Sequence, residues 1–182
     1  MRKIGIILFS SLILIFSFSC ESANPFGGPV YDTEGNLKID SLKIAEYLLT
    51  TPYDSLYRIH DPSGVVVIVQ EEGTGSRPRN NNVIYTNYVG KLLDGTVFDT
   101  NLENVAKEND LFVETATYNI FQFPLGSTSS IQGFSIGFQR MRSGSKGIII
   151  IPSPYGYRNQ ENINRIPPNS VLVFEVDFLG MD

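Results

Sequence analysis

Thiols, imidazoles and clusters of basic side chains are almost missing from this sequence. It contains one cysteine, one histidine and no tryptophan in 182 residues. A single cysteine cannot form an internal disulfide or build a thiolate metal cluster, and a single histidine argues against a zinc site. We interpret that histidine, His60, as a linker residue just ahead of the first strand. The sequence therefore predicts no bound metal.

Positive charge is also scarce. The chain has 14 Lys and Arg residues against 19 Asp and Glu residues, for a net charge of -5. Binding to a phosphate backbone needs clustered Lys and Arg, and no such cluster follows Arg2 and Lys3. We expect no nucleic-acid partner. The length suits one compact domain with an N-terminal extension.

Catalytic nucleophiles and acid–base pairs are not apparent either. No pair of carboxylates flanks a predicted pocket strand, and the only histidine lies outside the body of the domain. Gly73-Thr74-Gly75 lacks the lysine and the following helix of a phosphate-binding loop. The sequence thus predicts no cofactor, and any catalysis must proceed without a covalent step.

Residues 1–20 have the pattern of an export signal. Arg2 and Lys3 precede an apolar run from Ile4 to Phe18, and small residues lead to Cys20. A cysteine at this place resembles the lipid-modified cysteine of bacterial lipoproteins. We therefore expect lipidation at Cys20 and a protein anchored in the bacterial cell envelope, facing the periplasm or the cell surface. Secretion without an anchor is the alternative.

Residues 21–60 are predicted to form a tether with one short helix. Asn24-Pro25 and Gly27-Gly28-Pro29 break regular structure. Asp40 or Ser41 can cap a helix that Pro52 ends. We expect its apolar residues on one face, which packs on the domain itself or, alternatively, forms a homodimer through residues 40–49. These residues are Leu42, Ala45, Tyr47, Leu48 and Leu49.

The body of the domain, residues 61–182, is mostly strand. Strands are expected over 65–70, 83–92, 96–99, 117–125, 146–151 and 170–179, with Asp94-Gly95 as a hairpin turn. The polar stretch 100–110 is predicted to form a surface loop or a short helix. Residues 131–141 carry one apolar stripe and form the one clear helix of the body. The predicted fold class is α+β, with a twisted antiparallel sheet wrapped around one short amphipathic helix.

Six sequence segments carry a family resemblance when they are taken in order. They are YVGKLLDGTVFD at 88–99, FQFPLG at 121–126, IQGF at 131–134, MRSGSK at 141–146, IPSPYGY at 151–157 and IPPNSVLVFEV at 166–176. In this order they resemble the FK506-binding (FKBP-type) peptidyl-prolyl cis-trans isomerases. The resemblance covers about residues 64–179, and the family fold agrees with the α+β prediction.

The resemblance implies an isomerase that acts on proline-containing polypeptides and assists the folding of exported or envelope proteins. It implies catalytic roles for Asp99, Phe134 and Tyr157. Phe134 stands where the family often has tryptophan at the pocket floor, and the Ile131 N–H and the Tyr157 hydroxyl are implied to hold carbonyl oxygens of the ligand. The implied substrate-binding residues are Tyr88, Phe98, Phe121, Ile131, Ile166 and Phe174.

The sequence departs from the family pattern at three places. The stretch from Phe98 to Phe121 is longer than in compact members, so it contains an insertion, and the arginine that often accompanies the pocket aspartate has no clear equivalent. Ser129 and Ser130 replace bulkier or charged residues. Arg158 stands where glycine is typical, so we expect a different backbone in that loop. These departures keep an alternative open, a chaperone or adaptor lipoprotein that binds proline peptides with little or no turnover.

Overall fold

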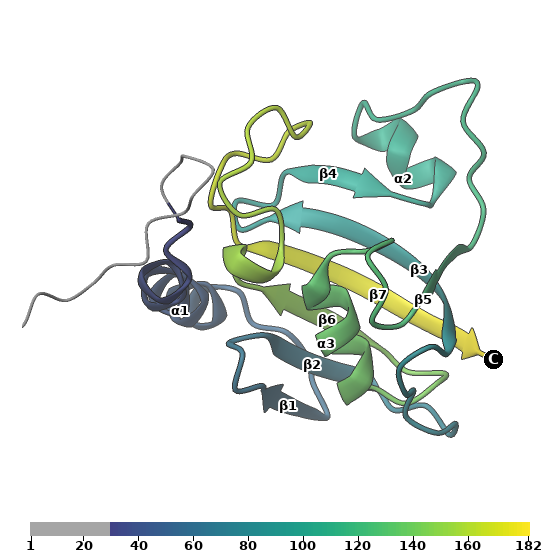
Figure 1. Cartoon of the computed structure of the whole chain (residues 1–182). Helices are drawn as coiled ribbons and strands as arrows, with labels where there is room; N and C mark the ends of the chain where they lie inside the picture. Colours follow the sequence, from purple (N-terminus) through teal and green to yellow (C-terminus); the bar gives the residue numbers. More distant parts are fainter. Residues whose placement is uncertain (1–29) are drawn as a thin grey trace, which may run out of the picture. The chain divides into compact units, whose positions relative to one another are not determined.

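The computed structural model describes residues 30–182, of which Tyr31–Asp182 form one compact unit. Figure 1 shows the arrangement of its helices and strands. The helices are α1 (Thr33–Thr50), α2 (Glu103–Glu108), α3 (Gln132–Arg140) and the 3-10 turn η1 (Ser153–Tyr155). The strands are β1 (Tyr57–His60), β2 (Val66–Glu71), β3 (Val83–Leu92), β4 (Val97–Thr100), β5 (Phe121–Pro124), β6 (Lys146–Ile151) and β7 (Leu172–Met181).

The strands form one antiparallel sheet in the order β1-β2-β6-β7-β3-β4. The long strand β3 pairs with β7 along one side. On its other side it pairs first with β5, from Val83 to Thr86, and then with β4, from Val89 to Lys91. Residues 101–120 therefore leave the sheet between β4 and β5, and the two strands share one edge of β3. The predicted α+β fold with an antiparallel sheet is confirmed.

Strand β6 is buried on both faces of the sheet. Ile149 and Ile151 pack into a core with α3, whereas Ile148 and Ile150 pack into a second core with Ile44 of α1. Successive side chains of a strand point to opposite faces, so a strand covered on both sides must be apolar throughout. The four consecutive isoleucines reflect this double burial.

Helix α3 lies in front of the sheet in the view of Figure 1 and packs closely on β6. Gly133 and Gly137 are four residues apart and face the strand. A Cβ atom built on Gly133 would lie 2.2 Å from Ile151 Cγ2, and one on Gly137 would lie 2.5 Å from Ile149 Cγ2. The two glycines therefore let the helix approach the sheet closely.

Helix α1 differs from its prediction. It begins at Thr33, not at Asp40 or Ser41, and Asp32 is the capping residue, whose side chain accepts a hydrogen bond from Gly35 N. Its inward face carries Asp40 and Ile44, both buried, while Leu42 and Leu49 are 74% and 86% exposed. Of the residues predicted for the packed face, Tyr47 and Leu48 do pack against the core around Ile44, whereas Leu42 and Leu49 point outward. The expected end at Pro52 is confirmed, since the helix stops at Thr50.

The segment before residue 61 also contains a strand that the sequence did not suggest. β1 pairs with β2, with His60 opposite Val66. The interpretation of His60 as a linker residue was therefore wrong, because it is the exposed last residue of an edge strand. Its burial alternates over only four residues, which is too short to stand out by pattern.

Apart from the strand predicted at 117–125, the remaining predicted strands and the predicted helix at 131–141 lie within about two residues of their expected bounds. The polar stretch after β4 forms the short helix α2, and the strand expected from residue 117 begins only at Phe121.

None of the helices in residues 30–182 is long and apolar enough to cross a membrane. Cys20 and the predicted signal lie outside the described residues.

Candidate functional site

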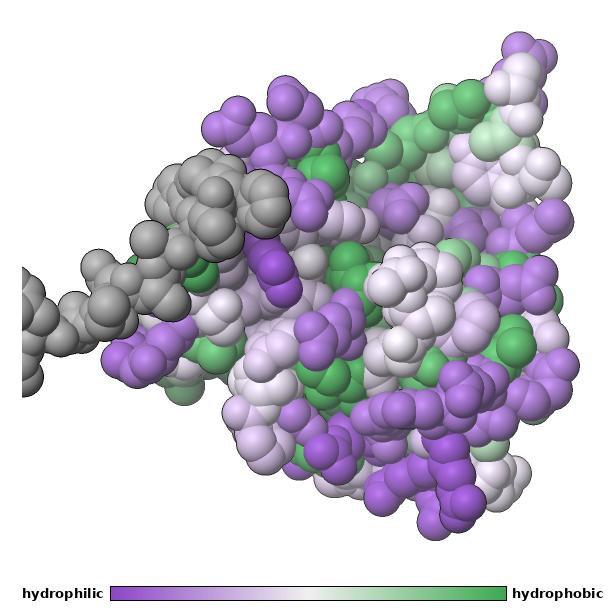
Figure 2. Space-filling view, viewed as in Figure 1, coloured by the Kyte–Doolittle hydropathy of each residue, from purple (hydrophilic) through white to green (hydrophobic). Residues whose placement is uncertain are grey.

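A pocket of about 230 Å³ opens beside the N-terminal end of α3. Its walls come from β3, β4, β5, β7, α3 with the residues just before it, and the loop after η1. Apolar side chains show through the polar surface at the centre of the face that carries α3 (Figure 2). The lining residues are Tyr88, Asp99, Phe121, Ser129, Ser130, Ile131, Phe134, Tyr157 and Phe174.

Phe134 lies at the bottom of this pocket and is 3% exposed. Its ring meets Phe174 at a centroid distance of 4.5 Å and an angle of 80°, and meets Tyr88 at 5.9 Å and 90°. Aromatic rings favour such edge-to-face contacts, which hold each ring in one orientation. The rings therefore form a rigid apolar concavity.

The pocket has a polar side where Tyr88 of β3 meets Asp99 of β4. The Tyr88 hydroxyl donates a hydrogen bond to Asp99 Oδ2 at 2.8 Å. Burial, followed by the charge of Asp99 and this hydrogen bond, raises the pKa of Tyr88 far above its ordinary value. Tyr88 therefore stays a neutral donor at physiological pH, and the Asp99 carboxylate is fixed at the rim.

Tyr157 enters the pocket from the loop that follows η1. Burial, followed by the charge of Asp99, raises the pKa of its hydroxyl, so it remains protonated. Arg158 has φ 56°, in the left-handed region that glycine favours. Arg158 thus adopts a backbone conformation that glycine adopts more readily, and the expected difference from the family's loop stays a prediction. The Arg158 N–H donates to Ser153 O at 3.0 Å and its carbonyl accepts from Asn169 N at 2.7 Å, which stabilises it there.

Seven of the nine residues predicted for the site line the pocket together. The other two, Phe98 and Ile166, are 5% and 7% exposed and belong to the core behind it. Phe98 supports the wall, since its ring meets that of Phe174 at 5.5 Å. The sequence patterns matched these two residues to the pocket but could not distinguish its lining from its support.

Two supporting residues were missed. Asn101 accepts from Tyr88 N at 2.8 Å and donates to Asn87 Oδ1 and Asn119 O, each at 2.9 Å, so it closes the base of the 101–120 segment. The buried Asp40 of α1 accepts from Ser153 N at 2.8 Å and Ser153 Oγ at 2.6 Å. Asp40 thereby fixes the start of the loop that carries Tyr157. No local sequence signal indicates either contact, because the partners are distant in the chain.

Residues 75–179 match the family model described as FKBP-type peptidyl-prolyl cis-trans isomerase. The chain belongs to this family. The matched range contains every pocket residue named above, whereas α1, β1 and β2 of this FKBP-type domain precede it.

Curated relatives and solved structures agree with this assignment. The chain is 34% identical over 120 residues to the FKBP-type peptidyl-prolyl cis-trans isomerase FkpA of Aeromonas hydrophila, covering 66% of this chain and 39% of that one. It is 33% identical to the human peptidyl-prolyl cis-trans isomerase FKBP4, over 65% of this chain and 24% of the relative. The chain thus spans well under half of these curated relatives.

Solved structures extend the similarity beyond the matched range. The crystal structure of a peptidyl-prolyl cis-trans isomerase from Pseudomonas syringae superposes with a TM-score of 0.60 at 26% identity, covering 85% of this chain and 99% of that one. That of FkpA from Escherichia coli gives a TM-score of 0.58 at 26% identity, over 83% of this chain and 60% of that one.

Proposed function

We propose that this protein catalyses the cis–trans isomerisation of Xaa-Pro peptide bonds in polypeptides and so assists the folding of exported or envelope proteins. The observation that carries the proposal is the aromatic pocket, in which Phe134, Phe174 and Tyr88 meet edge to face beneath a rim formed by Asp99 and Tyr157. A proline ring is apolar and compact, and a small concave aromatic site is suited to hold it. Family membership supports the same activity.

The chemistry follows from the nature of the barrier. Resonance gives the peptide bond partial double-bond character and a rotational barrier of about 18–20 kcal/mol. Water favours the planar, charge-separated form, and an aromatic pocket removes that water. Groups that bind the twisted amide more tightly than the planar one then accelerate rotation.

Three groups are proposed to act on the twisted amide. Ile131 precedes α3 and lines the pocket, and its backbone N–H is proposed to donate to a ligand carbonyl. The protonated Tyr157 hydroxyl donates to a second carbonyl. Asp99, held by Tyr88, orients the amide through its charge without transferring a proton. The proposed mechanism forms no covalent bond to the substrate.

A protease-coupled assay with a short Xaa-Pro peptide tests this function on the full chain. Wild type should accelerate isomerisation, and Tyr157→Phe and Phe134→Leu should lower kcat/KM by about tenfold or more, as expected when one transition-state contact is lost. Glu46→Gln, on the exposed part of α1, is the control.

Binding of the peptide without turnover would instead support the alternative, a proline-peptide-binding chaperone or adaptor. The 101–120 segment supports that alternative, because it offers further binding surface in a cavity that shares Asp99 with the pocket.

The cellular location is proposed from the sequence alone. Cys20 follows the predicted signal, and we propose that it is lipidated and anchors the protein in the cell envelope with its domain facing the periplasm or the cell surface. Metabolic labelling with a fatty acid should mark wild type and not Cys20→Ser. Membrane fractionation should release the variant into the soluble fraction, and retention of Cys20→Ser in the membrane would contradict the anchor.

The outward face of α1 is proposed to mediate homodimerisation. Ile39, Leu42 and Leu49 are 54%, 74% and 86% exposed, and their spacing places them on one stripe of the helix. Light scattering at increasing concentration should show a dimer that Leu42→Ser weakens. Leu179→Ser, which replaces a 42% exposed leucine outside α1, is the matched control. A monomer at every concentration would refute this proposal.

A further inference from the structure

A second cavity of about 530 Å³ lies directly beside the proline pocket. The two cavities share Tyr88, Asp99 and Phe121 as lining residues. The same three side chains thus form the boundary between them. A polypeptide whose proline occupies the pocket can place neighbouring residues in the second cavity without crossing another wall.

The segment 101–120 provides most of the outer wall of this second cavity. Leu111, Val113 and Ala116 supply apolar surface, and Val113 is 53% exposed. Apolar atoms gather along this segment at the upper right of Figure 2. Amide side chains, including Asn119 and Gln122, also line the cavity. Apolar surface beside amide groups suits a peptide, which presents an apolar side chain and backbone donors and acceptors together.

This wall is held in place before any ligand arrives. Asn101 ties the base of the segment to β3. Arg165, from the loop before β7, donates to Asn109 O at 2.7 Å and to Asp110 O at 2.8 Å, which fixes the turn after α2. The Phe112 and Tyr118 rings stack at 5.8 Å. A preformed wall binds a ligand without first having to be ordered.

We propose that the 101–120 segment forms a specificity subsite, in which a client polypeptide bound through proline places an apolar side chain from the adjoining residues. This inference rests on the proposed isomerase function and deepens it. The protein then recognises a stretch of polypeptide longer than the Xaa-Pro bond, and client choice depends on residues at a distance from the proline.

A charged residue that lines the subsite affects which client side chains should bind there. Asp99 is the one Asp, Glu, Lys, Arg or His side chain among the described residues that line the cavity, and it is exposed. A client with an acidic side chain there would be repelled by this like charge. Apolar residues should therefore be preferred over acidic ones at the position that enters the cavity.

The test compares two peptides with the same Xaa-Pro core, one of about four and one of about twelve residues, since an extended chain spans about 3.3–3.6 Å per residue. A series of long peptides places one leucine at successive positions on either side of the proline. For the best position, wild type should show kcat/KM about tenfold higher than for the short peptide, as burial of one apolar side chain permits. Aspartate at that position should abolish the advantage.

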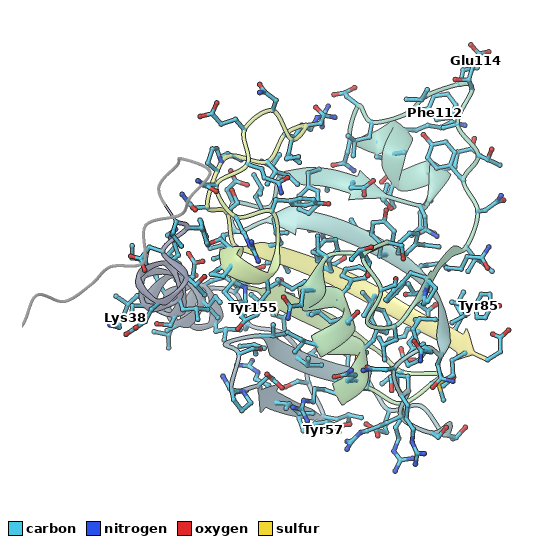
Figure 3. All side chains as sticks on the ribbon, viewed as in Figure 1. Lys38, Tyr57, Tyr85, Phe112, Glu114 and Tyr155 are labelled. Atoms are coloured by element: carbon cyan, nitrogen blue, oxygen red, sulfur yellow. The ribbon has the colours of Figure 1, made fainter. Side chains whose placement is uncertain are left out.

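The variant Ala116→Trp fills the cavity and should reduce the ratio of kcat/KM between long and short peptides to about one. Glu114→Trp is the matched control and should retain the wild-type ratio, because Glu114 is absent from the cavity lining and points outward at the tip of the segment (Figure 3). A ratio that is near one in wild type, or that survives in Ala116→Trp, would overturn the subsite.

The subsite can also be tested if the protein proves not to be an isomerase. If neither peptide is turned over, fluorescence anisotropy with the labelled long and short peptides measures the subsite directly. Tighter binding of the long leucine peptide, lost in Ala116→Trp and kept in Glu114→Trp, would support the subsite in a protein that binds without turnover. Equal binding of both peptides would refute the subsite as well.

Discussion

The α3 face of the sheet and the α1 face are both buried, but different kinds of side chain fill them. On the α3 face the core contains the rings of Phe123, Phe134, Phe138, Phe174 and Phe178. On the α1 face the buried apolar residues are all branched aliphatics, among them Ile44, Ile148 and Val173. The edge-to-face contacts hold the rings in fixed orientations, and the branched aliphatic side chains fill the other face at the density of an ordinary core.

The pocket lies on the aromatic face and is lined by several of these rings. The aromatic face combines rigidity with a concavity, which a binding site needs, and the aliphatic face provides a closed support behind it. The faces are joined by β6, whose side chains alternate between them, and by the contact of Asp40 with Ser153. The α1 face thus holds the loop of Tyr157 without contributing to the pocket lining.

Two neighbouring isoleucines of β6 provide the largest expected effects. Ile149→Ala removes a side chain from the α3 face and Ile148→Ala removes one from the α1 face, and each should lower the free energy of unfolding by about 2–5 kcal/mol. Only Ile149→Ala should also lower kcat/KM of the folded protein, because Ile149 packs against the helix that carries Phe134. Urea denaturation and the peptide assay measure the two effects. Equal losses of kcat/KM would mean that the pocket responds to both faces alike.

Asp40→Ala tests the link between the faces. The substitution leaves the buried Ser153 N–H without its acceptor, at a cost of about 1–3 kcal/mol, whereas the Ser153 hydroxyl keeps its hydrogen bond with the Tyr31 hydroxyl. Because Ser153 begins the loop of Tyr157, kcat/KM should fall more than in Ile148→Ala. Lys43→Ala removes the partly exposed partner of Asp40 and should cost less than about 1 kcal/mol. Unchanged stability in Asp40→Ala would show that the contact does not hold the loop.

Gly137→Ala tests how closely the α3 face is packed. Alanine favours a helix over glycine by about 1 kcal/mol, yet the added methyl group would meet Ile149. We expect a net destabilisation of about 1–3 kcal/mol by thermal or urea unfolding. Gly180→Ala has no atom within 4 Å of the added methyl group and should change stability by less than about 0.5 kcal/mol. If Gly137→Ala is more stable than wild type, α3 must lie farther from β6 than the structure shows.

The smallest expected effect is a loss of stability at alkaline pH that arises on both faces. Burial raises the pKa of Tyr88 on the α3 face, and burial with a hydrogen bond to Tyr47 raises that of Tyr53 on the α1 side. Above the ordinary tyrosine pKa of about 10, the unfolded chain loses these protons and the folded protein keeps them, so stability falls by up to about 1.4 kcal/mol per pH unit for each tyrosine.

Denaturant unfolding between about pH 9 and about pH 11 measures this slope. Tyr88→Phe and Tyr53→Phe should each make it shallower, because each removes one group that titrates differently in the two states. At neutral pH the tyrosines are protonated in both states and contribute no slope. A slope that neither substitution changes would assign the alkaline instability to other groups.

Much of the pocket could be predicted because its residues lie in short local segments. Tyr88, Asp99, Phe121, Ile131, Phe134, Tyr157 and Phe174 were all assigned from those segments and meet around one cavity. The exact bounds of β3 and β6 also followed from their patterns. Phe98 and Ile166 show the limit of this approach. A sequence pattern that assigns a side chain to the site does not say whether that side chain lines the pocket or packs in the core behind it.

The sequence by itself determined the antiparallel sheet, the helix that floors the pocket and the family to which the chain belongs, because strand alternation, glycine turns and ordered motifs are local signals. Only the tertiary structure decided the inward face of α1, the strand β1, the role of Asp40 and the second cavity beside the pocket. Each of these depends on contacts between residues far apart in the chain. The buried Asp40 shows the reason most clearly, since a charged residue belongs in a core only when a distant partner such as Ser153 satisfies it.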